Sequence, residues 1–297
     1  VQIPSEKLRA IVETVSMNEK SMSIRGDEID MKDYNPFNPS GSPAIDKHIV
    51  GLPNVGSFIV GAKSTTGKTS FAIKLAANYL DTHPGKEVHF ITLEDMAQGW
   101  RDRANWILGK RPDEFWHRFV IQEFAENTGD ILAEASKFPN LGMVIVDYID
   151  YLADASYEDY EKIHRNLNMG AKSLAVTHGG QMTVVIICQF TKAYTGGVPQ
   201  PKHLRFTGDA GAWTICLLYV PAKDWGTGDV SYVNGKKEES SYFLPTIQGK
   251  GYLCFWKVKA GFRLHKDEDS PGAVQVNWTG SKGYDLDDPG KWFVLSK

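Results

Sequence analysis

The chain has 297 residues, of which 42% are hydrophobic and 23% are charged, a balance that gives a globular protein enough apolar surface for one large core. Its formal net charge of −3 excludes a protein that binds nucleic acid through an overall basic surface, but it allows positive charge concentrated in a few loops. No apolar run approaches the roughly 20 residues that span a bilayer, and the first residues lack the apolar core of a signal peptide, so we expect no membrane contact and a cytoplasmic location.

The N-terminal part is predicted to be a helix followed by a linker or extended arm. Apolar residues from Leu8 to Val15 recur at helical spacing after Ser5, a residue type that caps helices. From about residue 22 to residue 43 the chain is polar and contains Gly and Pro, which is typical of a linker. We therefore divide the chain into residues 1–44, a helix and arm, and residues 45–297, one globular body.

Within the body, β-rich runs alternate with helical patterns. The runs lie at residues 57–60, 88–92, 119–124, 143–146 and 183–188. This alternation indicates an α/β fold with a mainly parallel, twisted sheet flanked by helices. After a further run at residues 216–220 the helical patterns stop. The runs at 252–258 and 273–278 then predict C-terminal antiparallel strands that extend the sheet.

One segment between a predicted strand and a predicted helix carries the strongest chemical signal. We interpret Gly61 to Thr69 as a phosphate-binding loop of the G-x-x-x-x-G-K-[ST] type. In such a loop, backbone N–H groups and the helix N-terminus converge on a phosphate, Lys68 contacts the β and γ oxygens, and the Thr69 hydroxyl binds Mg²⁺. The sequence therefore predicts a P-loop ATPase that uses ATP and Mg²⁺. The predicted nucleotide-contacting residues of the loop are Gly61, Ser64, Thr65, Thr66, Gly67, Lys68, Thr69 and Ser70.

Two carboxylates at strand ends complete the predicted site. Asp147 ends the apolar run that starts at Met143, which is the arrangement by which a Walker B strand holds Mg²⁺. Glu94 follows the run at residues 88–92, where it can orient and deprotonate the attacking water. Asp95 is an alternative for that role, and a helix N-terminal carboxylate without a catalytic role is a further one.

Taken in chain order, these motifs resemble the RecA-like motor domain of the DnaB-family replicative helicases, of phage or plasmid type. The resemblance covers about residues 45–280, and the order and spacing of the motifs carry it more than any single motif after the first. The motifs are residues 61–69, Thr92-Leu93-Glu94, residues 145–152, residues 186–189 and residues 204–208. It implies a hexameric ring that translocates 5'–3' on single-stranded DNA and hydrolyses ATP at its subunit interfaces.

The resemblance also implies roles for individual residues. Glu94 resembles the family's catalytic glutamate, Asp147 its Walker B aspartate, and Gln189 the glutamine that senses the γ-phosphate. The segment from Lys192 to Arg205 then corresponds to the loop that contacts DNA. A Gly-rich loop that carries Lys192, Lys202 and Arg205 suits contact with a nucleic-acid backbone, although a solvated surface loop has the same composition.

A basic pair on a late strand reaches the neighbouring subunit's γ-phosphate in this family. Here Lys257 and Lys259 occupy that place, whereas the helicases usually have Arg at the second position. Lysine lacks the bidentate fork of arginine. The resemblance therefore leaves two candidates for the trans-acting cation, Lys259 and Arg263. It also implies replisome partners such as primase or polymerase, in the cytoplasm of a bacterium or of a phage-infected host.

Other functional classes share the same core motifs. A RecA-like recombinase or a KaiC-like ATPase differs in what the ring or filament does. If the chain were instead an assembly protein switched by ATP, we would expect slow ATP turnover and no directional movement. A small-molecule kinase is disfavoured, because it leaves Glu94 unexplained.

Overall fold

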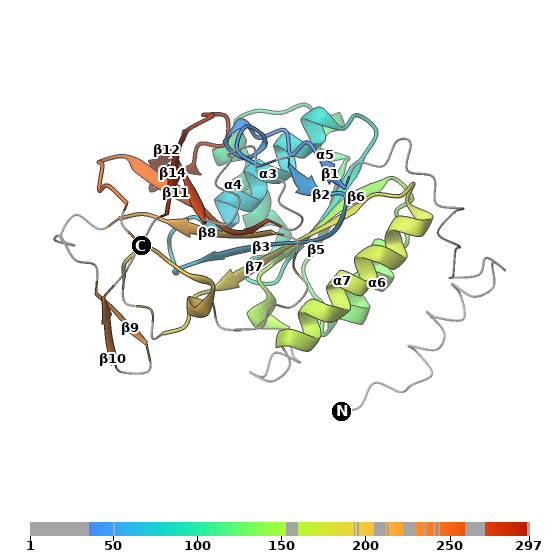
Figure 1. The fold of residues 1–297 in the computed structure, drawn as a ribbon. Coiled ribbons are helices and arrows are strands. Elements are labelled where there is room, and N and C mark those ends of the chain that lie inside the picture. Colours follow the sequence, from blue (N-terminus) through green and yellow to red (C-terminus); the bar gives the residue numbers. More distant parts are fainter. Residues whose placement is uncertain are drawn as a thin grey trace, which may run out of the picture.

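A computed structural model of the chain describes most of the predicted body. The described residues are 36–49, 51–152, 160–192, 194, 196–204, 212, 214–221, 230–233, 236–239, 242, 244–258 and 271–295. The predicted N-terminal helix lies outside them. The architecture is a ten-stranded mixed sheet with helices on both faces (Figure 1), as the sequence predicts.

The parallel half of the sheet contains every strand predicted from the alternating pattern. In spatial order its strands are β8 (Thr214–Tyr219), β3 (Val55–Ala62), β7 (Met182–Gln189), β6 (Leu141–Asp147), β4 (Glu87–Thr92) and β5 (Phe119–Gln122). All neighbouring pairs in this series are parallel. Their carboxyl ends therefore meet at one edge of the sheet, where ligands bind in open α/β folds.

The other half of the sheet is antiparallel, which confirms the prediction for the C-terminal strands. It consists of β11 (Lys250–Val258), β12 (Gly272–Thr279), β13 (Gly283–Tyr284) and β14 (Lys291–Val294). β11 pairs with β8 and with β12, and β12 pairs with β13 and β14. Two small antiparallel pairs lie apart from the main sheet: β1 (Phe37–Asn38) with β2 (Leu52–Pro53), and β9 (Val230–Val233) with β10 (Lys236–Glu239).

Helices cover the two faces of the sheet in separate layers (Figure 1). One face holds α3 (Lys68–Thr82), α4 (Ala97–Leu108) and α5 (Asp113–Trp116), and the other holds α6 (Thr128–Ala135) and α7 (Tyr160–Thr177). Three one-turn helices complete the described chain: α2 (Pro43–Asp46), η2 (Ile149–Tyr151) and η3 (Pro201–His203). Among the described residues, no helix is long and apolar enough to cross a membrane.

The sheet has one hydrophobic core on each face, because its central strands carry apolar residues on both sides. In β3, Val60 packs in the core below α3 while Ile59 packs in the core of α6 and α7, because successive side chains of a strand point to opposite faces. Phe37 and Ala44 also belong to the α3-side core, so the described chain joins the body from residue 37. The division of the chain at residue 44 stays a prediction.

Candidate nucleotide-binding site

The predicted phosphate loop connects β3 to α3 at the carboxyl edge of the sheet. The hydroxyl of Thr66 donates to the carbonyl of Lys63 over 2.6 Å, and the Thr66 backbone N–H reaches the same carbonyl over 3.4 Å. Thr65 has a φ of 64° and Gly67 a φ of 90°, the left-handed conformations that fold a chain back on itself before a helix. A Cβ on Gly67 would lie 3.4 Å from the Cα of Gly283 in β13, so the antiparallel extension of the sheet supports the loop.

The assignment of Gly61 to the loop pattern needs a correction. Five residues separate Gly61 from Gly67, so Ala62 occupies the first position of the pattern. Ala62 belongs to β3, and Thr65 is the position of positive φ among the described non-glycine residues, so alanine fits at residue 62 without strain. Gly61 is needed for packing instead, because a Cβ there would lie 2.3 Å from Leu204 Cδ2 and 2.7 Å from Leu217 Cδ2.

Lys68 places a buried positive charge under the loop. Its side chain is almost fully covered, and its Nζ lies 3.5 Å from the carbonyl oxygen of Lys63 and 5.9 Å from the centre of the Tyr148 ring. Burial lowers the pKa of Lys68, while the charges of Asp147 and Glu94 act in the opposite direction. The ammonium group therefore lies among negatively charged side chains at the carboxyl edge of the sheet.

Asp147 ends β6, and β7 separates that strand from β3. The residue is 3% exposed, and the Thr69 side chain acts to lower its pKa. The Oδ1 atom is buried and has no hydrogen-bond partner among the described residues. Burial, partly offset by Thr69 and Lys68, raises the pKa of Asp147 to about 6. A carboxylate and a hydroxyl are oxygen ligands of the kind that Mg²⁺ prefers, so Thr69 and Asp147 fit the predicted metal.

The two acidic residues after β4 differ in their surroundings. The backbone N–H of Leu93 donates to the carbonyl of Asp147 over 2.9 Å and holds this segment against β6. Glu94 is exposed, and its charge acts on both Lys68 and Asp147, so it faces the phosphate site. Asp95 instead forms an ion pair with Arg103 of α4 at 2.9 Å. Of the two carboxylates, Asp95 is thus held by an ion pair, whereas Glu94 is exposed beside Lys68 and Asp147.

Gln189 ends β7 directly beside the phosphate-loop strand. Its Cα is in register with that of Ala62, and the next backbone N–H, of Phe190, donates to the Ala62 carbonyl over 3.0 Å. The half-buried Gln189 side chain thus lies between β3 and β6, the strands that lead to Lys68 and Asp147.

The segment after Gln189 is anchored at both ends. Phe190 and Leu204 form an isolated antiparallel bridge, and the N–H of Thr191 donates to the carbonyl of His203 over 2.7 Å. Within the segment, Tyr194 is buried and its hydroxyl donates to the Gly197 carbonyl over 2.5 Å. Lys192 and Lys202 are exposed, whereas Arg205 lies outside the described residues. The described part of this loop is therefore packed into the core on the α7 side, with Lys192 and Lys202 exposed.

The predicted trans-acting cations are described only in part. Lys257 lies half-buried near the end of β11, opposite Ile215 of β8, whereas Lys259 and Arg263 are outside the described residues. Two residues close to Asp147 escaped the sequence reasoning. The Tyr148 ring flanks Lys68, and Asp150 adds negative charge near Lys68 while it accepts a hydrogen bond from Tyr160 of α7. Their position directly after Asp147 is the signal that could have found them.

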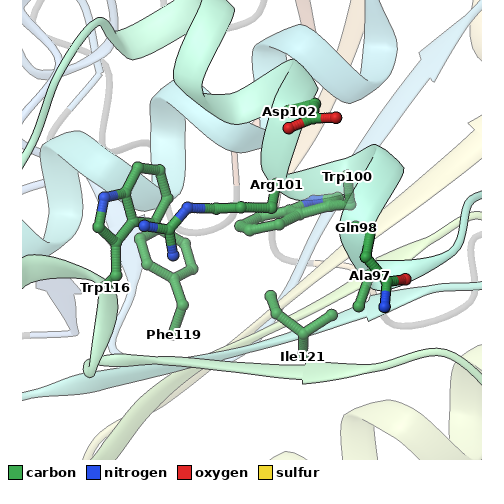
Figure 2. Close-up of a pocket in the computed structure, with 8 residues that line it drawn as sticks. All are labelled: Ala97, Gln98, Trp100, Arg101, Asp102, Trp116, Phe119 and Ile121. Carbon is green, nitrogen blue, oxygen red and sulfur yellow. The ribbon is translucent and has the colours of Figure 1, made fainter. Parts of the chain in front are cut away.

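A separate pocket of about 390 Å³ lies beside α4, α5 and β5 (Figure 2). The guanidinium group of Arg101 stacks on the ring of Trp116 at 3.6 Å, and Trp100 and Phe119 form apolar walls. None of the predicted nucleotide-site residues lines this pocket. It is therefore distinct from the phosphate site.

Comparison with known proteins agrees with this geometry. The sequence profile of a family described as an AAA domain matches residues 39–194. A curated relative, the "Probable plasmid replicative DNA helicase" of Chlamydia psittaci, is 24% identical over an alignment that covers 73% of this chain and 54% of the relative. The chain thus spans about half the length of that relative.

Two solved structures share the fold. One is an isolated ATPase domain, with a TM-score of 0.59 and 18% identity, covering 95% of this chain and 98% of that one. The other is a DnaB-like replicative helicase, described together with its interactions with primase, with the same TM-score and identity, covering 95% of this chain and 74% of that one. These comparisons confirm the resemblance to DnaB-type motor domains and the RecA-like fold.

Proposed function

The chain belongs to the AAA domain family, and on that premise we propose that it is the ATP-hydrolysing motor of a replicative DNA helicase. The convergence of Lys68, Thr69, Asp147 and Glu94 at one edge of the sheet carries this proposal. The likeness to a probable plasmid replicative helicase supports DNA as the track on which the motor acts.

In the proposed reaction, the triphosphate of ATP lies over the loop from Ala62 to Thr69. Backbone N–H groups at the start of α3 and the Lys68 ammonium bind its β- and γ-phosphates. Thr69 and Asp147 would hold Mg²⁺, which when bound neutralises phosphate charge. The buried carboxylate of Asp147 suits this role because its Oδ1 has no hydrogen bond from the described chain.

Glu94 orients a water molecule for in-line attack on the γ-phosphorus and accepts its proton. Its exposure leaves it open to solvent water, and its charge already acts on Lys68 across the site. Gln189 detects whether the γ-phosphate is present. The neighbouring bond from Phe190 to Ala62 then links the phosphate-loop strand to the segment from Lys192 to Arg205.

The lysines of that segment, Lys192 and Lys202, together with Arg205, contact the backbone of single-stranded DNA. We infer a hexameric ring with ATP between subunits. Lys257 and either Lys259 or Arg263 reach the neighbour's γ-phosphate, because such a trans-acting cation couples hydrolysis to movement between subunits. The proposed movement is 5'–3', and primase and polymerase are the proposed replisome partners.

Unwinding of forked DNA tests this proposal. A labelled duplex with a 5' single-stranded tail, one with a 3' tail and one with both should be incubated with ATP, Mg²⁺ and either the parent chain or Lys68→Ala. The proposal predicts strand separation by the parent on substrates with a 5' tail, and none by Lys68→Ala. Homologous strand exchange without unwinding would indicate a recombinase instead, and ATP-dependent assembly without either activity would indicate an ATP-switched assembly protein.

A further inference from the structure

The outer side of α7 carries a line of exposed residues that the proposed motor does not use. These residues, named here the α7 stripe, are Lys162, Arg165, Met169, Lys172 and Val176. Their spacing of three and four residues places them on one side of the helix, opposite the side whose residues are buried. Met169 is 62% exposed and Val176 is 80% exposed.

Such a stripe has the chemistry of a binding surface for an acidic segment with apolar side chains. The stripe has three cations, whereas α7 has one carboxylate, Glu161, which pairs with Arg165 over 3.2 Å. Both partners of that pair are exposed, so the pair contributes little and leaves the stripe net positive. Exposed apolar residues rimmed by charge mark interaction sites more often than isolated apolar residues do.

We propose that residues 27–33 of this same chain bind the α7 stripe. This segment reads Asp-Glu-Ile-Asp-Met-Lys-Asp and therefore has four carboxylates against one lysine. In an extended chain, Asp27, Ile29, Met31 and Asp33 point to the same side. That side presents two apolar side chains between two carboxylates, which complements apolar residues placed between cations.

The described chain starts close to the end of α7. The carbonyl of Pro36 accepts a hydrogen bond from the backbone N–H of Asn54 over 2.8 Å. The side chain of Asn38 accepts one from Gln181 Nε2 over 3.3 Å. Gln181 follows Thr177, the last residue of α7, by four positions. The step from Asp33 to Pro36 spans at most about 10 Å, so Asp33 lies within that distance of Pro36.

The lengths of the two partners also match. The stripe runs about 21 Å from Lys162 to Val176 at 1.5 Å per residue, and seven extended residues cover about 23 Å. A segment that enters at the C-terminal end of α7 runs antiparallel to the helix. Six extended steps span about 20 Å, so this direction places Asp33 beside Lys172, Met31 over Met169 and Asp27 toward Lys162. The inference does not depend on the proposed helicase activity.

Cysteine cross-linking of the full chain tests the proposal. Met31→Cys combined with Met169→Cys should form an intramolecular disulfide under mild oxidation, identified by peptide mapping at low protein concentration. Met31→Cys combined with Asp113→Cys is the matched control, because Asp113 is exposed on the opposite face of the sheet. The native cysteines at 188, 216 and 254 are buried and free, so they contribute little background.

Charge reversal separates specific binding from chance encounters. Replacing Lys162 and Lys172 by Glu should lower the cross-linking rate at least about fivefold, the factor expected for two exposed ion pairs. Replacing Asp27 and Asp33 by Lys in the same protein should restore the rate. The proposal is overturned if the control pair cross-links equally fast, if the product forms only between two chains, or if charge reversal leaves the rate unchanged.

Discussion

Replacing Asp147 by Asn should stabilise the nucleotide-free protein while it abolishes hydrolysis. The folded chain holds this carboxylate 3% exposed, and burial raises its pKa from 3.8 to about 6. That difference corresponds to a cost of about 3 kcal/mol for the ionised group near neutral pH. The new Asn amide lacks a full set of hydrogen-bond partners, which offsets about 1 kcal/mol of the stability gained. We therefore expect a net gain of about 2 kcal/mol, or about 5 °C in Tm.

The pH dependence of this gain has a definite sign. Because the folded-state pKa of Asp147 is raised, the cost is fully present above about pH 6 and disappears as the pH falls toward 3.8. Urea denaturation of Asp147→Asn and the parent, without nucleotide or Mg²⁺, should show the gain near pH 7.5 and little difference near pH 4. Added Mg²⁺ and ATP should stabilise the parent more than the variant. A variant that is less stable near pH 7.5, or a difference independent of pH, would refute the reasoning.

Three further predictions concern Lys68, the two acidic residues after β4, and the buried His89. Lys68→Met should reduce the ATPase rate at least about a hundredfold, because it removes the buried charge that we propose binds the γ-phosphate. Circular dichroism checks that the fold is kept, and near-parental turnover would contradict the proposed role. Glu94→Gln should lower kcat about a hundredfold or more with nucleotide binding retained, whereas Asp95→Asn should change kcat by less than about threefold; equal losses in steady-state assays would contradict the assignment. Burial lowers the pKa of His89 from 6.5 to about 4, so the free energy of unfolding should fall as the pH drops from 6.5 to 4. His89→Leu should remove up to about 3 kcal/mol of that loss, measured by denaturation at several pH values. If the free energy of unfolding of the variant fell with pH as steeply as that of the parent, this prediction would be wrong.

The pattern of the sequence predicts much of the parallel sheet, because both of its faces are buried. Runs such as residues 143–146 and 183–188 contain mainly β-branched and other apolar residues, and the structure places them in β6 and β7. Strand ends are less well defined by pattern alone. The predicted run to residue 124 ends at Gln122 in the structure, and Phe124 is 70% exposed, because β5 is an edge strand that pairs only with β4 among the described strands.

Site residues that follow strands were predictable because parallel strands bring their carboxyl ends together. Lys68 and Asp147 lie close together for this reason. The contribution of Tyr148 beside Lys68 depends on the path of the chain after β6, which no period in the sequence encodes. The support that Gly283 gives to Gly67 comes from contacts far apart in the chain, and sequence spacing alone does not predict such contacts.

The most direct test of the central claim is steady-state ATPase activity with and without single-stranded DNA, measured together with mass by light scattering. The parent chain should be compared with Lys68→Ala, Lys259→Ala and Arg263→Ala. The account predicts strong stimulation by DNA in a species of about six subunits, lost in Lys68→Ala and in one of the two other variants. DNA-independent turnover by a monomer that tolerates both Lys259→Ala and Arg263→Ala would contradict the proposed motor.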